Sequence, residues 1–101
     1  MNIAAEVDRG KLAELCRRYH VRQLSVFGSA VRNELRPESD IDFLIEFAPE
    51  SRPGMVEFYQ LEQELSALYG GRRVDLVNPR YLNHRIRERV LAEAELQFAE
   101  G

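Results

Sequence analysis

The amino-acid sequence predicts a single α/β (α+β) domain in which a mixed three-stranded sheet carries helices mainly on one face. Apolar residues switch repeatedly between helical and strand spacing, and glycine and proline residues separate the segments. The hydrophobic fraction of 45% and the charged fraction of 31% are those of an ordinary globular protein. The expected order of elements is α-β-α-β-α-β-α, and a chain of 101 residues is expected to form one domain, residues 1–101, around one modest core.

The first three elements are predicted from residues 3–35. Residues 3–19 form an amphipathic helix in this prediction, because most of their apolar side chains recur at helical spacing. The β-forming segment 21–28 follows as the first strand and ends at a glycine. Residues 29–35 have helical character for about two turns, until Pro37 ends the helix.

The segment DIDFLIEF, residues 40–47, is the clearest strand, because its apolar and polar side chains alternate. One face is expected to carry Ile41, Phe43, Ile45 and Phe47. The other face is expected to carry Asp40, Asp42, Leu44 and Glu46. This alternation predicts a strand with one face on the core.

The remaining segments complete the predicted order. A turn-rich loop leads to a helix whose apolar residues run from Met55 to Leu68 and which ends near Gly70. The segment 72–78 is a short strand, and apolar residues at helical spacing then predict a final helix across 82–98.

The connections place three acidic residues at one end of the predicted sheet. An antiparallel pairing of the first two strands brings Gly28 and Ser29 close to Asp40, and the helix after the second strand has the length of a parallel crossover. Asp75 would then lie on the same side as Asp40 and Asp42, on a neighbouring strand. We expect a cluster of three carboxylates on the open face of the sheet.

Such a cluster requires a counter-charge. Two unit charges at about 4 Å repel each other by about 4 kcal/mol at an effective dielectric of about 20. An all-oxygen site with room for water and phosphate suits Mg²⁺ or Mn²⁺ better than zinc. Neither His20 nor His84 has metal-ligand spacing to these acids, so both histidines are interpreted as surface or capping residues.

The residues around Gly28 suit a polyphosphate. Glycine lets the backbone approach a ligand closely, and Ser29 would begin a helix with free N–H groups. Arg32, one turn later, could reach a phosphate or brace the loop through neighbouring acids. The alternative interpretation is that Ser29 is only an N-cap, Ser39 only precedes a strand, and the aspartates are solvated turn residues.

Composition excludes several classes of protein. The formal net charge of −3 argues against binding nucleic acid through the overall field, although the arginine-rich segment 80–89 leaves a local basic patch open. No apolar run approaches the roughly 20 residues of a membrane span, and no signal peptide is visible, so a cytoplasmic protein is expected. The single Cys16 excludes an internal disulfide and is expected to pack on a helix.

The glycine-serine pair and the aspartates together resemble the motif of a known enzyme superfamily. Residues 28–29 (Gly-Ser), ten intervening residues and then residues 40–42 (Asp-Ile-Asp) resemble the motif of the DNA polymerase β-like nucleotidyltransferase superfamily. Asp75 in VDLV is similar to its third carboxylate. Arg32, Ser39 and the segment LNHRIRERVLAEA narrow the resemblance to the minimal nucleotidyltransferases (MNT), which include antitoxins paired with HEPN toxins.

The resemblance implies an NTP-dependent transfer of a nucleotidyl group, usually AMP from ATP. It implies that Asp40 and Asp42 bind two divalent ions, Mg²⁺ or Mn²⁺, and that Asp75 joins one ion and takes the proton from the attacking hydroxyl.

The resemblance also implies a set of nucleotide-binding residues. Gly28 and Ser29 would position the triphosphate, Arg32 would support that loop, and Ser39 is a further candidate of the same motif.

The sequence leads to two hypotheses about the function. The first is an Mg²⁺-dependent antitoxin that transfers AMP to a tyrosine hydroxyl of a HEPN ribonuclease toxin and so neutralises it. The alternative is a non-catalytic antitoxin that neutralises its partner by binding alone, which the acidic charge and short chain favour. A transferase acting on a small molecule is a weaker third hypothesis, since about 100 residues leave little room for an acceptor pocket.

Overall fold

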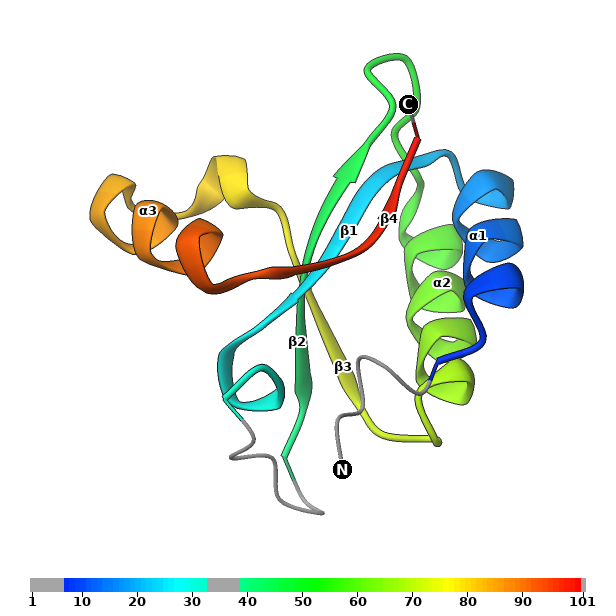
Figure 1. Cartoon of the computed structure of the whole chain (residues 1–101). Coiled ribbons are helices and arrows are strands. Elements are labelled where there is room, and N and C mark those ends of the chain that lie inside the picture. The colour runs from blue at the N-terminus through cyan, green and yellow to red at the C-terminus, as the bar shows by residue number, and fades with distance from the viewer. Residues whose placement is uncertain (1–6, 33–38, 101) are drawn as a thin grey trace.

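The computed structural model describes residues 7–32 and 39–100, and in this part of the chain it contains three α-helices, two short 3-10 helices and four strands (Figure 1). Their bounds in chain order are α1 Arg9–Arg18, β1 Val21–Phe27, η1 Gly28–Ala30, β2 Ile41–Phe47, α2 Met55–Leu68, β3 Val74–Val77, η2 Pro79–Tyr81, α3 His84–Glu93 and β4 Glu95–Ala99. Within the described ranges every helix falls short of the length and hydrophobicity that a membrane span requires.

The four strands form one mixed sheet in the order β3-β2-β1-β4. β1 pairs antiparallel with β2, and β2 pairs parallel with β3 across the α2 crossover, so both predicted pairings are confirmed. The α/β class is confirmed as well. The C-terminal end of β1 and the N-terminal ends of β2 and β3 therefore lie at the same end of the sheet.

The core lies between the sheet and the pair of helices α1 and α2, which cover one face (Figure 1). The apolar face of β2 points into this core as predicted. The fully buried side chains include Leu12, Leu24, Val26, Ile41, Phe43, Ile45, Leu61 and Leu65. Tyr69 closes the core at the end of α2: its ring packs edge-on against Phe43 at 5.0 Å, and its hydroxyl donates to Oε1 of Gln97 at 2.7 Å.

The C-terminal segment differs from the prediction. The expected helix across 82–98 ends at Glu93, Ala94 adopts extended backbone angles, and residues 95–99 form β4 instead. β4 pairs antiparallel with β1 and supplies ladder hydrogen bonds that a longer helix would leave unmade. Strand pairing with β1 thus outweighs the helical spacing of the apolar residues in this segment. The sheet has four strands instead of the predicted three.

Three further details correct the sequence prediction. α1 begins at Arg9, where the side chain of Asp8 caps the helix, and residues 3–6 of the expected helix lie outside the described residues. A 3-10 turn follows β1 where the expected helix 29–35 would begin, and residues 33–35 of that helix lie outside the described part. Leu44 was expected to face outward, yet it is buried. The segment η2 packs against β2, and α3 lies on the side of the sheet opposite α1 and α2 (Figure 1).

Candidate active site

Gly28 lies in direct contact with Asp42. Its φ of +77° is in the left-handed region, and a Cβ built on it would lie 2.7 Å from Oδ2 of Asp42. β1 and β2 create this contact, because Phe27 is the cross-strand partner of Asp42. The position needs glycine both for its backbone angles and for its lack of a side chain. The predicted close approach of the backbone at Gly28 is therefore present, and its neighbour is a carboxylate.

The carboxylates of Asp42 and Asp75 come from neighbouring strands. The two residues are direct partners in the parallel pairing of β2 with β3, so their side chains leave the sheet on the same face. Asp40 precedes β2 by one residue and is exposed. Burial, followed by the negative charges of Asp75 and Asp40, raises the pKa of Asp42, and Arg32 partly offsets this effect. The structure thus brings the three predicted acids within electrostatic reach of one another.

These acids suit a cation that is only partly enclosed. Across residues 7–32 and 39–100, no three histidine, cysteine, aspartate or glutamate side chains form a ready-made metal cage. Mg²⁺ retains several waters and typically binds through one or two carboxylates together with substrate phosphates. The pair Asp42 and Asp75, with Asp40 beside them, matches that donor set and lacks the nitrogen and sulfur ligands that zinc prefers. The residues therefore fit a hard divalent cation that shares its coordination with a phosphate.

Arg32 is held by a residue that the sequence analysis missed. Its Nη1 donates to both carboxylate oxygens of Glu93 at 3.2 and 3.3 Å, and the backbone N–H of Gly28 donates to Oε1 of the same residue at 3.3 Å. Glu93 is the last residue of α3, and its carboxylate is partly shielded from solvent. The end of α3 therefore fixes both the start and the end of the segment 28–32.

Ser29 and Ser39 lie in the two described segments on either side of residues 33–38. Ser29 belongs to the 3-10 turn η1, in which the N–H groups of Val31 and Arg32 donate to the carbonyl of Gly28, and its side chain is half-buried. Within the described residues, the segment after Gly28 therefore begins as a 3-10 turn. Ser39 is half-buried immediately before Asp40.

The two histidines lie on the surface, and an arginine of the segment 80–89 stabilises a turn. His20 is exposed in the turn after α1, and His84 is exposed at the start of α3, so both histidines lie on the surface as expected. Within the arginine-rich segment, Arg87 donates to the carbonyls of Pro79, Arg80 and Leu82 and so braces the turn before α3.

The aromatic residues on α2 and at its C-terminal end do not form one surface on which a nucleotide base could stack. Tyr69 is buried in the core, Phe58 packs against Phe47 at 6.4 Å, and only Tyr59 is exposed. Cys16 is buried on α1 as predicted.

The family described as "Polymerase beta, Nucleotidyltransferase" matches residues 10–100. The chain belongs to this family. The resemblance that the glycine-serine and aspartate motifs suggested is confirmed, and the protein is a nucleotidyltransferase. It is 45% identical over 80 residues to the protein adenylyltransferase MntA of Thermococcus cleftensis, a match that covers 79% of this chain and 78% of the relative.

Solved structures share the nucleotidyltransferase fold. A candidate minimal nucleotidyltransferase superposes with a TM-score of 0.70 and 38% identity over 86% of each chain. A toxin-antitoxin structure with AMP-PNP gives a TM-score of 0.68 at 21% identity and covers 93% of this chain and 75% of that one. A complex of a tri-AMPylated HEPN toxin with its MNT antitoxin, from Shewanella oneidensis, gives 0.59 at 20% identity over 91% and 70%.

Proposed function

We propose that this nucleotidyltransferase is an antitoxin that transfers AMP from ATP to a tyrosine hydroxyl of a HEPN ribonuclease toxin and so neutralises it in the cytoplasm. The observation that carries the proposal is the pairing of Asp42 with Asp75 across adjacent strands, directly beside Gly28. The relative MntA is named a protein adenylyltransferase, and two structural neighbours are toxin-antitoxin complexes, one with an ATP analogue and one with an AMPylated toxin.

In the proposed reaction, the acceptor hydroxyl attacks the α-phosphorus of ATP, the bond to the β-phosphate oxygen breaks and pyrophosphate leaves. Two divalent cations, Mg²⁺ or Mn²⁺, would offset the charge that develops on the phosphates. Asp40 and Asp42 would hold them, and Asp75 would join one of them. Asp75 would also accept the proton of the attacking hydroxyl.

The turn beside the carboxylates would position the triphosphate. Gly28 lets the backbone approach the phosphates, and Ser29 offers a hydroxyl on the same turn. Arg32 would support this turn through its ion pair with Glu93. Ser39, next to Asp40, is the remaining proposed nucleotide-binding residue.

Transfer can be tested with labelled ATP, the purified chain and the HEPN protein with which it naturally associates. We expect label on the toxin in the presence of Mg²⁺ or Mn²⁺ and none with EDTA. Asp40→Asn combined with Asp42→Asn should abolish labelling, whereas Glu88→Gln, on the exposed face of α3, should retain it. Absence of label with both metals would count against the enzymatic function.

Neutralisation by binding alone is the second candidate. The observation that favours it is a set of exposed apolar side chains on and around α3, which suits a protein interface: Tyr81, Ile86, Leu91 and Leu96. Full neutralisation of the toxin by the Asp40→Asn, Asp42→Asn variant would decide in favour of this function. Loss of neutralisation with retained complex formation would decide in favour of AMP transfer.

A further inference from the structure

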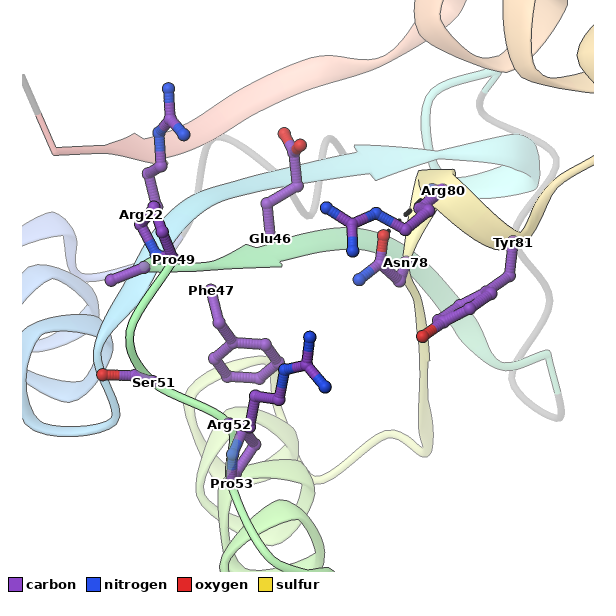
Figure 2. Close-up of a pocket in the computed structure, with 11 residues that line it drawn as sticks. Arg22, Glu46, Phe47, Pro49, Ser51, Arg52, Pro53, Asn78, Arg80 and Tyr81 are labelled. Carbon is purple, nitrogen blue, oxygen red and sulfur yellow. Dashed lines mark hydrogen bonds between the residues drawn. The ribbon is translucent and has the colours of Figure 1, made fainter.

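A pocket lies at the C-terminal ends of β2 and β3 (Figure 2), and its lining residues do not include Gly28 or the three aspartates. Its volume is about 310 Å³. The chemistry of its walls comes mainly from Arg22, Glu46, Arg52, Asn78, Arg80 and Tyr81. We call it the arginine pocket. Its walls come from β1, β2, the loop after β2 and η2, so it is formed only in the folded chain.

The arginine pocket has a positive charge although the whole chain is acidic. Three arginines and one acid, Glu46, line the pocket, whereas the whole chain has a formal net charge of −3. In the described part of the chain, no hydrogen bond or ion pair involves the guanidinium of Arg22, Arg52 or Arg80. Arginine side chains that line a concave surface without protein partners favour an anionic ligand.

The wall formed by η2 is held in place before any ligand binds. The side chain of Asn78 accepts from the N–H of Arg80 at 2.9 Å, which leaves the amide NH₂ of Asn78 as a donor. Arg87 binds the carbonyls of Pro79, Arg80 and Leu82 from α3. Tyr81, on the same turn, is 81% exposed and presents its ring beside Asn78 and Arg80 (Figure 2). A cation, an amide and an aromatic ring are thus carried on one short turn whose backbone is held by hydrogen bonds.

The arginine pocket lies along the same two strands as the catalytic acids. Glu46 follows Asp42 by four residues on β2 and shares its face, and Asn78 follows Asp75 by three. At about 3.3 Å per strand residue the pocket begins about 10 to 13 Å from the acids. A nucleotide with its base, ribose and phosphate spans a distance of this order, so a group joined to the reacting acceptor could reach the pocket.

We propose that the arginine pocket is a second nucleotide site, which holds an AMP group already attached to the acceptor while the next AMP is transferred. The inference rests on the proposed function, and the three AMP groups on the related toxin give it a substrate. The arginines would bind the phosphodiester, Tyr81 would stack on the base and Asn78 would donate to it. Glu46 can accept from a ribose hydroxyl, which explains a carboxylate among the arginines.

Binding can be measured by calorimetry with free AMP in EDTA. We expect the combined Arg52→Gln, Arg80→Gln variant to weaken AMP binding at least about tenfold, because charge-assisted hydrogen bonds are lost. Arg89→Gln removes a positive charge from the exposed face of α3 and should leave binding unchanged. Loss of AMP binding only in the Asp40→Asn, Asp42→Asn variant would place the nucleotide at the catalytic acids and overturn the proposal. Binding of an acidic peptide such as oligoglutamate, without any AMP binding, would overturn it as well.

Mass spectrometry of the toxin gives an independent readout. The Arg52→Gln, Arg80→Gln variant should lower the ratio of toxin with two or more AMP groups to toxin with one group by about tenfold relative to Arg89→Gln. Equal ratios in the two variants would overturn the proposal. If wild-type chain transferred no AMP at all, the proposed function would fail, while the calorimetric result would still report on the pocket. Thermal unfolding of each variant checks that it is folded.

Discussion

The Cα of Gly28 rests against the carboxylate of Asp42, and a Cβ at this position would lie 2.7 Å from Oδ2. The turn that is proposed to receive the triphosphate and a carboxylate that is proposed to bind the metal therefore share one contact. The end of β1 cannot move relative to the start of β2 without changing the distance between these two parts of the site.

Gly28→Ala should abolish AMP transfer, because the new methyl group displaces the Asp42 carboxylate. Gly71→Ala is the matched control: Gly71 has nearly the same φ, +79°, but nothing lies within 4 Å of its Cβ position. Both variants should lose roughly 1 kcal/mol of stability from the positive φ. Activity assays and thermal unfolding separate the two effects. Equal activity in both variants would show that the contact with Asp42 is unimportant.

Asp42→Asn should stabilise the metal-free protein at neutral pH. Burial and the charges of Asp75 and Asp40 raise the pKa of Asp42, so at a pH between the unfolded and the folded pKa the folded state holds a proton that the unfolded state has released. Wild-type stability should therefore fall as pH rises from about 4 until it passes the raised pKa of Asp42. The asparagine variant should lack this component of the pH dependence. Thermal unfolding in EDTA across about pH 4 to 7 tests the sign, and a wild-type stability that rose more steeply than that of the variant would contradict it.

Glu93→Gln should lower the catalytic efficiency about tenfold with little change in stability. The substitution removes the charge that holds Arg32, but an ion pair this exposed contributes only about 0 to 1 kcal/mol to folding. Glu88→Gln on the same helix is the control, since Glu88 pairs only with the exposed His84 among the described residues. Steady-state kinetics in ATP provide the measurement. Tighter ATP binding by Glu93→Gln would instead mean that Glu93 competes with phosphate for the N–H of Gly28.

Tyr69→Phe should destabilise the protein by about 1 to 3 kcal/mol, because the buried Oε1 of Gln97 loses its donor. Tyr59→Phe removes a hydroxyl from an exposed side chain and should have almost no effect. Adding Gln97→Leu to Tyr69→Phe removes the unsatisfied acceptor and should recover part of the loss. Denaturant unfolding measures all three variants, and equal stability of Tyr69→Phe and Tyr59→Phe would refute this account of the core.

Cys16 should be inert to thiol reagents in the folded protein. Burial raises the pKa of its thiol to about 12, so almost no thiolate is present near neutral pH. Labelling with a disulfide reagent should therefore proceed at the rate at which the chain opens. Leu12→Ala, in the same core, should accelerate labelling, whereas rapid labelling of the wild-type chain under native conditions would contradict the buried position.

The sequence was sufficient for β2 and its neighbours because a strand with one buried face leaves a strong alternating pattern. The same reasoning failed at residues 95–99. Val90, Ala94 and Phe98 follow one another at helical spacing, but the free edge of β1 offered hydrogen bonds that no local pattern reports. Element type at the C-terminus was decided by a partner strand far away in the sequence.

Some residues of the candidate site could likewise be proposed from the sequence, and others could not. Gly28, Asp40, Asp42 and Asp75 could be proposed from the sequence because each lies at or near the end of an element and is a residue type with a chemical requirement. Glu93 could not be identified, because it is separated by 65 positions from Gly28 and looks like any acid on a helix. The arginine pocket was equally hidden, since it gathers side chains from four separate segments.

The pairing of β1 with β4 joins an early segment to a late one. β1, β2, α2 and β3 all precede Glu95–Ala99 in the chain, so the edge of β1 that pairs with β4 stays unpaired until this strand is present. A bare edge is a template for unwanted strand addition. We therefore expect chains that stop before β4 to aggregate more readily than chains that contain it, because β4 covers an otherwise unpaired edge of β1.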